Sequence, residues 1–295
     1  MIEVIVEQNM NGKTVVVTGA TDGIGKVTAL ELARMGARLG LVGRNPEKTM
    51  AVAEELRQMS GNANIDPWVA DLSLMGQTRR LAEELKQRYD RLDVLVNNAG
   101  AFNASRVETS EGLEMTFALN HMSYMILTLE LLALLKASAP SRIVNVSSAA
   151  HFGGRLDLND LQSKRKYSGW LVYSRSKLAN IYFTYELARR LDGSGVTVNA
   201  LHPGFVATKF GQNNGGVVKP FVKFSQRIWA ITPEQGAQTS IYLASSPEVE
   251  GVSGRYFARS KAVPSSPVSY DKDIAAELWR RSLEIAGMAE PQMVH

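Results

Sequence analysis

A tyrosine and a lysine four residues apart could move a proton. Tyr173 and Lys177 form the pattern Y-S-R-S-K within an apolar helical pattern, and this spacing places both side chains on one helix face. A free phenol, with a pKa near ~10, is a poor base at neutral pH, but a neighbouring ammonium lowers that value. The pair is therefore predicted to act in acid/base chemistry, although the same pattern can arise by chance as a tyrosine beside a surface lysine.

Two serines close a predicted buried strand in the stretch RIVNVSSAA. Hydroxyls at the carboxyl end of a strand in an open α/β sheet face the ligand crevice. Strand alternation would send Ser147 and Ser148 to opposite sides, so the two cannot share a catalytic role. The nearby His151 raises the possibility of a serine hydrolase, but the chain has no G-x-S-x-G elbow, and we interpret His151 as a loop residue.

The glycine-rich stretch VTGATDGIGKV follows an apolar run and opens a helical pattern. A Walker A loop needs a glycine five residues before the Gly-Lys pair and a hydroxyl after it, but Ala20 and Val27 occupy those positions. Gly19, Gly23 and Gly25 instead fit a dinucleotide loop, in which the pyrophosphate approaches the backbone at a helix N-terminus. A glycine-rich turn can also serve only to reverse the chain.

The end of the second predicted strand bears on the choice of cofactor. An acidic residue there would hold the adenosine ribose hydroxyl, but the sequence LGLVGRN places Gly43 and Arg44 at this point. A guanidinium suits a 2′-phosphate, and no carboxylate repels it. NADP(H) is therefore favoured over NAD(H), unless Arg44 is simply a solvated loop residue.

Composition bounds the class of protein. The 295 residues include 45% hydrophobic and 21% charged residues, with a net charge of +4 spread along the chain, which is typical of an ordinary globular protein and does not imply a nucleic-acid partner. The absence of cysteine excludes disulfides and thiolate chemistry, and no metal site is predicted. No signal peptide or membrane span is expected, so we predict a cytoplasmic location.

Apolar β-branched runs alternate with helical patterns, which predicts a single α/β domain over residues 1–295 with a doubly wound parallel sheet (Rossmann fold) in three layers. The irregular stretch 205–231 is predicted to be a substrate-binding lid. Its apolar residues suggest a hydrophobic substrate or simply pack the lid onto the body. The expected strands are 14–18, 38–42, 65–70, 93–97, 142–147, 197–202 and 255–257, and the expected helices are 24–35, 46–59, 75–88, 110–136, 170–191 and 233–244.

Together these elements resemble the short-chain dehydrogenase/reductase family from about Lys13 to Phe257. The motifs that carry the resemblance are TGATDGIG, Asp71-Leu72, LVNNAG, Asn120, NVSS, YSRSK and HPGFVAT. The resemblance implies that Ser148 orients the substrate carbonyl, that Tyr173 is the general acid/base, that Lys177 binds the nicotinamide ribose and tunes the tyrosine, and that Asn120 holds a relay water.

The same resemblance implies a set of cofactor contacts. They are Gly19, Thr21, Asp22, Gly23, Ile24, Gly25, Arg44, Asn45, Asp71, Leu72, Asn98, Ala99, Gly100, Tyr173, Lys177, Pro203, Gly204, Val206 and Thr208.

The 25 positions between Ser148 and Tyr173 are about twice the separation in most of the family. The inserted segment is similar to that of the retinol dehydrogenase-like branch, which often prefers NADP(H). The N-terminal anchor of many animal members is not apparent, so the resemblance implies no microsomal role. A homo-oligomer, dimer or tetramer, is expected from the family.

The sequence thus predicts an NADP(H)-dependent oxidoreductase that interconverts a carbonyl, aldehyde or ketone, and an alcohol by hydride transfer, with Tyr173 as general acid/base. The alternative is a non-catalytic dinucleotide-sensing or scaffold protein with the same fold.

Overall fold

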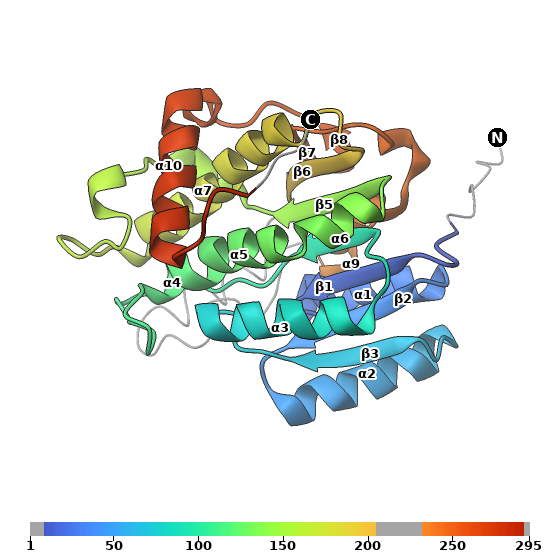
Figure 1. The fold of residues 1–295 in the computed structure, drawn as a ribbon. Helices are drawn as coiled ribbons and strands as arrows, with labels where there is room; N and C mark the ends of the chain where they lie inside the picture. Colours follow the sequence, from blue (N-terminus) through green and yellow to red (C-terminus); the bar gives the residue numbers. More distant parts are fainter. Residues whose placement is uncertain (1–8, 205–231, 292–295) are drawn as a thin grey trace.

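In a computed structural model, which describes residues 9–204 and 232–291, the strands form one sheet with the order β3-β2-β1-β4-β5-β6-β7-β8 (Figure 1). All neighbours pair in parallel except β7 and β8, which are antiparallel. The order reverses direction beside β1, as in a doubly wound sheet, so the predicted fold class is confirmed. The strands are β1 (Thr14–Thr18), β2 (Arg38–Gly43), β3 (Ile65–Val69), β4 (Val94–Asn97), β5 (Ser141–Val146), β6 (Val196–His202), β7 (Arg255–Ala258) and β8 (Lys261–Ala262).

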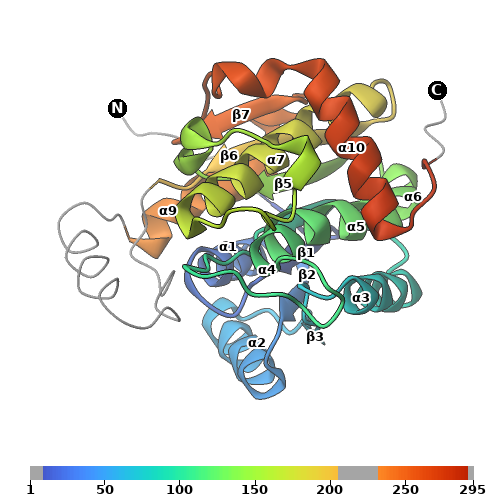
Figure 2. The same cartoon turned by 90° about the vertical axis from the view of Figure 1, so that its left-hand side faces the viewer.

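Helices cover both faces of this sheet (Figures 1 and 2). On one side lie α1 (Gly23–Arg34), α2 (Pro46–Ser60) and α9 (Pro233–Ser245). On the other lie α3 (Met75–Arg88), α5 (Ser123–Glu130), α6 (Leu132–Ala137), α7 (Gly169–Arg190) and α10 (Lys272–Ala286). None of the helices in the described part of the chain is long and apolar enough to cross a membrane.

The central strands are apolar on both faces because each face is buried beneath helices. Alternate residues of paired strands enter two separate cores. One core contains Val16, Leu95 and Ile143, and the other contains Val17, Val96 and Val144. Strands that are covered in this way leave only their ends accessible for chemistry.

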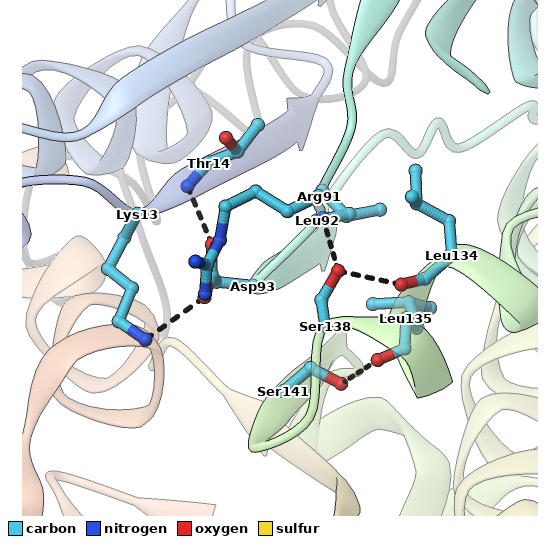
Figure 3. Close-up of polar contacts among 9 residues, drawn as sticks. All are labelled: Lys13, Thr14, Arg91, Leu92, Asp93, Leu134, Leu135, Ser138 and Ser141. Atoms are coloured by element: carbon cyan, nitrogen blue, oxygen red, sulfur yellow. Dashed lines mark hydrogen bonds and ion pairs between the residues drawn. The ribbon is translucent and has the colours of Figure 1, made fainter. Parts of the chain in front are cut away.

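The amino ends of β1 and β4 are fixed by a buried carboxylate (Figure 3). Asp93 accepts hydrogen bonds from Thr14 N at 2.9 Å, from Lys13 Nζ at 3.0 Å and from Arg91 Nη2 at 2.6 Å. Burial raises the pKa of Asp93, but these donors outweigh it and hold the pKa below its usual value. Ser138, which accepts from Leu92 N, attaches the end of α6 to the same edge. This edge is therefore fixed by ion pairs, which leaves the carboxyl edge for the site.

One predicted helix differs from the structure. The expected helix over 110–136 is wrong at its start and in its continuity, because regular structure begins with α4 (Met115–Phe117) and passes through a π-helical segment, η1 (Ala118–Met122), before α5. Glu114 caps the start by accepting from Thr116 N and Phe117 N. Upstream, an antiparallel bridge between Glu108 and Glu114 keeps the chain non-helical.

The sequence analysis also missed β8 and α10. Helix α10 packs along α7, where Trp279 stacks on Phe183 with ring centroids 5.9 Å apart and Arg190 lies 4.4 Å from the centroid of the indole. Its apolar residues repeat at helical spacing, so this helix could have been found from the sequence. One side of α7 is consequently buried within the chain.

Candidate active site

The glycine loop between β1 and α1 forms a cradle that larger residues would fill. Gly19 has a φ of +64°, and a Cβ at this position would lie 2.8 Å from Ala99 Cα. A Cβ on Gly25 would lie 2.4 Å from Asn98 Nδ2, which donates to Thr18 O at 2.8 Å. The loop therefore packs closely against the residues that follow β4, Asn98 and Ala99, which the sequence analysis gave as cofactor contacts.

The start of α1 lies in this cradle. Asp22 caps the helix by accepting from Gly23 N at 2.9 Å. The first-turn N–H groups, which include that of Ile24, have no carbonyl one turn earlier within the helix, so an anion is favoured there. Lys26 pairs with Glu55 on α2 at 2.7 Å. The residues present fit a dinucleotide pyrophosphate.

The end of β2 lies beside the loop. Ala20 N donates to Val42 O at 3.0 Å, and a Cβ on Gly43 would lie 2.4 Å from Thr21 Cγ2. Gly43 is thus required for this packing, which explains why no carboxylate occupies its position. Arg44 follows and is exposed, and no hydrogen bond or ion pair engages it within residues 9–204 and 232–291.

Two neighbours of Arg44 complete this corner. Asn45 caps α2 by accepting from Lys48 N at 2.8 Å. Lys48 Nζ bonds Asp22 Oδ2 at 2.8 Å, so a second cation, which the sequence analysis missed, lies at the glycine loop. Its position after a predicted cap was the signal that could have located it.

The end of β3 supplies Asp71 and Leu72. Asp71 Oδ1 accepts from the backbone N of Ser73 at 3.0 Å and from its hydroxyl at 2.7 Å, while Leu72 is buried in the core. A fixed carboxylate with a second oxygen is suited to hydrogen bonding an adenine amine.

The predicted catalytic residues converge where β5 ends. Tyr173 and Lys177 are buried on α7, with exposed fractions of 7% and 4%. Lys177 Nζ donates to Val146 O at 3.0 Å and lies 5.8 Å from the centroid of the Tyr173 ring. The Ser148 hydroxyl is hydrogen-bonded to the side chain of Tyr173. The structure therefore brings all three side chains together.

The titration of this pair differs from the sequence prediction. Burial raises the pKa of Tyr173 to about 12, and the hydrogen bond to Ser148 opposes this rise. Burial also lowers the pKa of Lys177 to about 7. The prediction that an ammonium lowers the pKa of the tyrosine is wrong for the chain alone, because burial of the phenol has the larger effect on its pKa. Burial keeps the phenol protonated, which is the form that donates a proton.

Asn120 lies in the π-helical segment η1, a geometry that is frequent at functional sites. Its Nδ2 donates to Ala101 O and to Ser176 Oγ, both at 3.0 Å. A Cβ on Gly100 would lie 3.2 Å from Asn120 Oδ1 and 3.4 Å from Lys177 Nζ. Asn120 and Lys177 thus flank the same glycine.

The two serines have separate roles, but not for the predicted reason. β5 ends at Val146, so both serines lie beyond the strand and alternation does not apply. Ser147 is buried and its hydroxyl donates to Lys177 O at 2.7 Å. Ser148 is partly exposed and caps the 3₁₀ segment η2 (Ala149–Gly153), where its Oγ accepts from Ala150 N at 3.2 Å. Ser148 is the serine available to a ligand.

The nicotinamide end of the predicted site is only partly described. Pro203 and Gly204 follow β6, and Gly204 N donates to His202 Nδ1 at 3.1 Å. Val206, Thr208 and the predicted lid over 205–231 lie outside the described residues.

The buried lysine makes stability depend on pH. Since burial lowers its pKa from 10.5 to about 7, the unfolded chain binds a proton between these values that the folded chain does not, and the wild type gains stability as pH rises through this window. Lys177→Met should therefore be more stable than the wild type at pH 6, by on the order of 3 kcal/mol, and should lose this advantage near pH 10. Urea unfolding at both pH values measures the difference.

The control is Lys164→Met, a substitution at an exposed lysine. Its effect on the free energy of unfolding should be small and the same at both pH values. A Lys177→Met difference that does not change between pH 6 and pH 10 would contradict the buried-lysine interpretation.

A doubly wound sheet with a glycine loop at its switch point and a buried Tyr–Lys pair at the carboxyl edge defines a dinucleotide-dependent oxidoreductase. The sequence pattern of the short chain dehydrogenase family matches residues 13–216. The chain belongs to the short-chain dehydrogenase/reductase family and, within it, to the retinol dehydrogenase-like branch.

Specific relatives support this assignment. The chain is 46% identical to human retinol dehydrogenase 14 over 296 residues, which cover 95% of this chain and 88% of the relative. An uncharacterized protein from Mycobacterium paratuberculosis has a similar crystal structure, with 32% identity, a TM-score of 0.79 and 96% of each chain covered. The Pseudomonas aeruginosa RhlG/NADP active-site complex shares 29% identity with a TM-score of 0.68, over 85% of this chain and 96% of the other.

Proposed function

We propose that the chain interconverts a hydrophobic carbonyl and the corresponding alcohol with NADP(H) as cofactor. The observation that supports this most directly is the cluster of the partly exposed Ser148 with the buried Tyr173 and Lys177, joined to the glycine loop through residues 98–100. Ala99 packs against Gly19 at one end of this link, and the Gly100 position lies beside Lys177 at the other.

The cofactor supplies a hydride to the carbonyl carbon when it is bound. The glycine cradle and the start of α1 bind its pyrophosphate, and Arg44 with Lys48 binds the 2′-phosphate. Lys177, on α7 with its Nζ at the end of β5, would hold the ribose hydroxyls. These roles use the donors and cations that the described residues place at the carboxyl edge.

Proton chemistry belongs to the side chains. Ser148 orients the substrate carbonyl by hydrogen bonding its oxygen, and Tyr173 delivers the proton to the same oxygen. A protonated phenol fits the reductive direction. Asn120 and Lys177, which flank Gly100, form the path along which the proton is replaced.

Aromatic side chains beside Tyr173 favour a hydrophobic substrate. The ring centroid of Phe102 lies 6.1 Å from that of Tyr173, and that of Trp170 lies 6.2 Å away. Trp170 is 60% exposed, so its ring offers apolar area to a ligand at this end of α7. Relatives named retinol dehydrogenases make a polyene aldehyde a reasonable member of the substrate class.

A substrate panel tests the proposal. We expect NADPH oxidation, followed by absorbance, with at least one of all-trans-retinal, decanal and benzaldehyde, and a rate about tenfold lower with NADH, since a charge-assisted hydrogen bond to the 2′-phosphate contributes ~1.5–3 kcal/mol. The reverse assay uses the matching alcohols and NADP⁺. Binding of NADPH without oxidation by any carbonyl would instead favour the dinucleotide-sensing alternative.

The cytoplasmic location and the homo-oligomeric assembly stay predictions. Because α10 buries Trp279 and Leu283 against the body, an assembly of this chain is proposed to use a surface other than the side of α7 that α10 covers.

A further inference from the structure

A histidine that the proposed chemistry does not use is fully buried next to Ser148. His151 lies in η2 with an exposed fraction of 0%. The T-shaped contact with Tyr256 on β7 has ring centroids 4.9 Å apart, and Phe152 packs on the ring at 4.2 Å. A polar ring in such a place requires partners for both nitrogens.

Both ring nitrogens meet backbone groups whose hydrogen-bonding roles cannot change. Nδ1 lies 2.7 Å from Ser148 O, and Nε2 lies 3.0 Å from Ser266 N. A carbonyl only accepts and a backbone N–H only donates, so Nδ1 must carry the proton and Nε2 must present its lone pair. The tautomer is therefore fixed as neutral Nδ1–H, and a second proton on Nε2 would face the Ser266 donor.

The titratable groups around the ring agree with a neutral imidazole. His202 on β6 stacks on Tyr256 at 5.8 Å, and the hydroxyl of Tyr256 lies 3.4 Å from Nδ1. Burial lowers the pKa of His151, the bond to Ser148 O opposes this, and the charge of His202 lowers it further. None of these neighbours carries a carboxylate that would stabilise an imidazolium.

The contact lies within the turn that carries the Ser148 hydroxyl. Ser148 O accepts from the His151 ring and also from His151 N at 3.1 Å. This closes the turn in which Ala150 N donates to Ser148 Oγ at 3.2 Å. With one lone pair of Oγ engaged by Ala150, the hydroxyl proton is left for Tyr173 or a substrate oxygen.

We propose that His151 is a positioning residue. Its Nδ1–H holds the Ser148 carbonyl and thereby fixes the direction of the Ser148 hydroxyl. Its Nε2 accepts from Ser266 N and so attaches this turn to the segment between β8 and the 3₁₀ segment η5 (Pro267–Tyr270). The inference rests on the proposed function of Ser148. It assigns a role in catalysis to a contact between the C-terminal part of the chain and the serine turn.

Two substitutions separate the two halves of the contact. The amide nitrogen of His151→Asn occupies the place of Nδ1 and retains the donor to Ser148 O, whereas His151→Gln retains an acceptor near Ser266 N but loses that donor. With NADPH and all-trans-retinal, or the fastest carbonyl of the panel above, kcat of His151→Gln should fall at least about tenfold with KM nearly unchanged, because a misaligned catalytic group costs rate. His151→Asn should stay within about threefold of the wild type.

Matched controls identify a purely structural effect. Ser266→Ala keeps the backbone N–H and removes a hydroxyl that has no hydrogen-bond partner among the described residues, so kcat should be unchanged. Thermal unfolding of every variant shows whether it folds. Equal kcat values for folded His151→Asn and His151→Gln would overturn the proposal.

A spectroscopic measurement needs no variant. The ¹⁵N spectrum of the full chain with labelled histidine and bound NADPH, at pH 7, should show His151 as the Nδ1–H tautomer, and an Nε2–H tautomer would overturn the inference.

Ser148→Ala distinguishes a failure of the proposed function of Ser148 from a failure of the positioning role of His151. If it retains activity, the proposed function of Ser148 fails. If it is inactive while His151→Gln equals the wild type, only the role of His151 fails.

Discussion

Replacing Tyr173 by phenylalanine is expected to lower kcat for carbonyl reduction by about 1,000-fold while NADPH still binds. The change removes one hydroxyl and keeps the ring between Phe102 and Trp170, so packing is retained. Burial, which raises the pKa of this phenol to about 12, makes it the protonated donor beside the Ser148 hydroxyl. Steady-state NADPH oxidation measures kcat, and quenching of protein fluorescence measures cofactor binding.

Tyr167→Phe is the matched control. Its hydroxyl bonds Asn103 O at 3.0 Å, in the loop that packs against the start of α7, and Glu114 Oε1 at 3.3 Å. This variant should keep activity within a few-fold, since neither bond involves Ser148 or Lys177 and each contributes ~0.5–1.5 kcal/mol. Substantial turnover by Tyr173→Phe would show that another group delivers the proton.

Arg44→Ala should raise the KM for NADPH by up to ~100-fold and change the KM for NADH by less than about threefold. The guanidinium is exposed at the end of β2 and has no partner within the described residues that would compete for it. A hydrogen bond between two charged groups contributes more than a neutral one, and only NADPH carries the additional phosphate. Steady-state kinetics with each cofactor at saturating carbonyl measure the ratio.

Arg34→Ala serves as the comparison, because Arg34 lies at the far end of α1 and pairs with Glu31 at 2.7 Å. It should affect neither cofactor. Equal increases in KM for NADPH and NADH in Arg44→Ala would mean that Arg44 does not bind the 2′-phosphate. Lys48, which forms an ion pair with Asp22, would then be the cation to test.

The ordered motifs of the sequence predict residues that lie together in the structure. The glycines, Asn98, Ser148, Tyr173 and Lys177 all lie at one edge of the sheet, because parallel strands of this class present their carboxyl ends together. These residues could be selected as candidates from the sequence because each one depends on a local feature, which is a turn, a strand end or a helical spacing.

Other features could not be predicted from local sequence patterns. The break in the helix at η1 depends on Glu114 capping a later start, and α5 is apolar enough to mask that boundary. The directions in which the pKa values of Tyr173 and Lys177 shift could not be predicted from the sequence either. Spacing gives Lys177 a place beside Tyr173, but burial of both side chains decides which of them is charged.

The sequence by itself determined the class of fold, the family and which residues are candidates for the chemistry, since strand periodicity and motif spacing are local properties. Only the tertiary structure decided how those residues are set. Thr21 and Thr49 leave no room for a side chain at position 43. Lys26 forms an ion pair with Glu55, whereas Arg44 is exposed. The His151 ring accepts a hydrogen bond from Ser266 N, 115 residues further along the chain. Such contacts join distant segments, and burial of polar groups forces them to find partners wherever the fold places one.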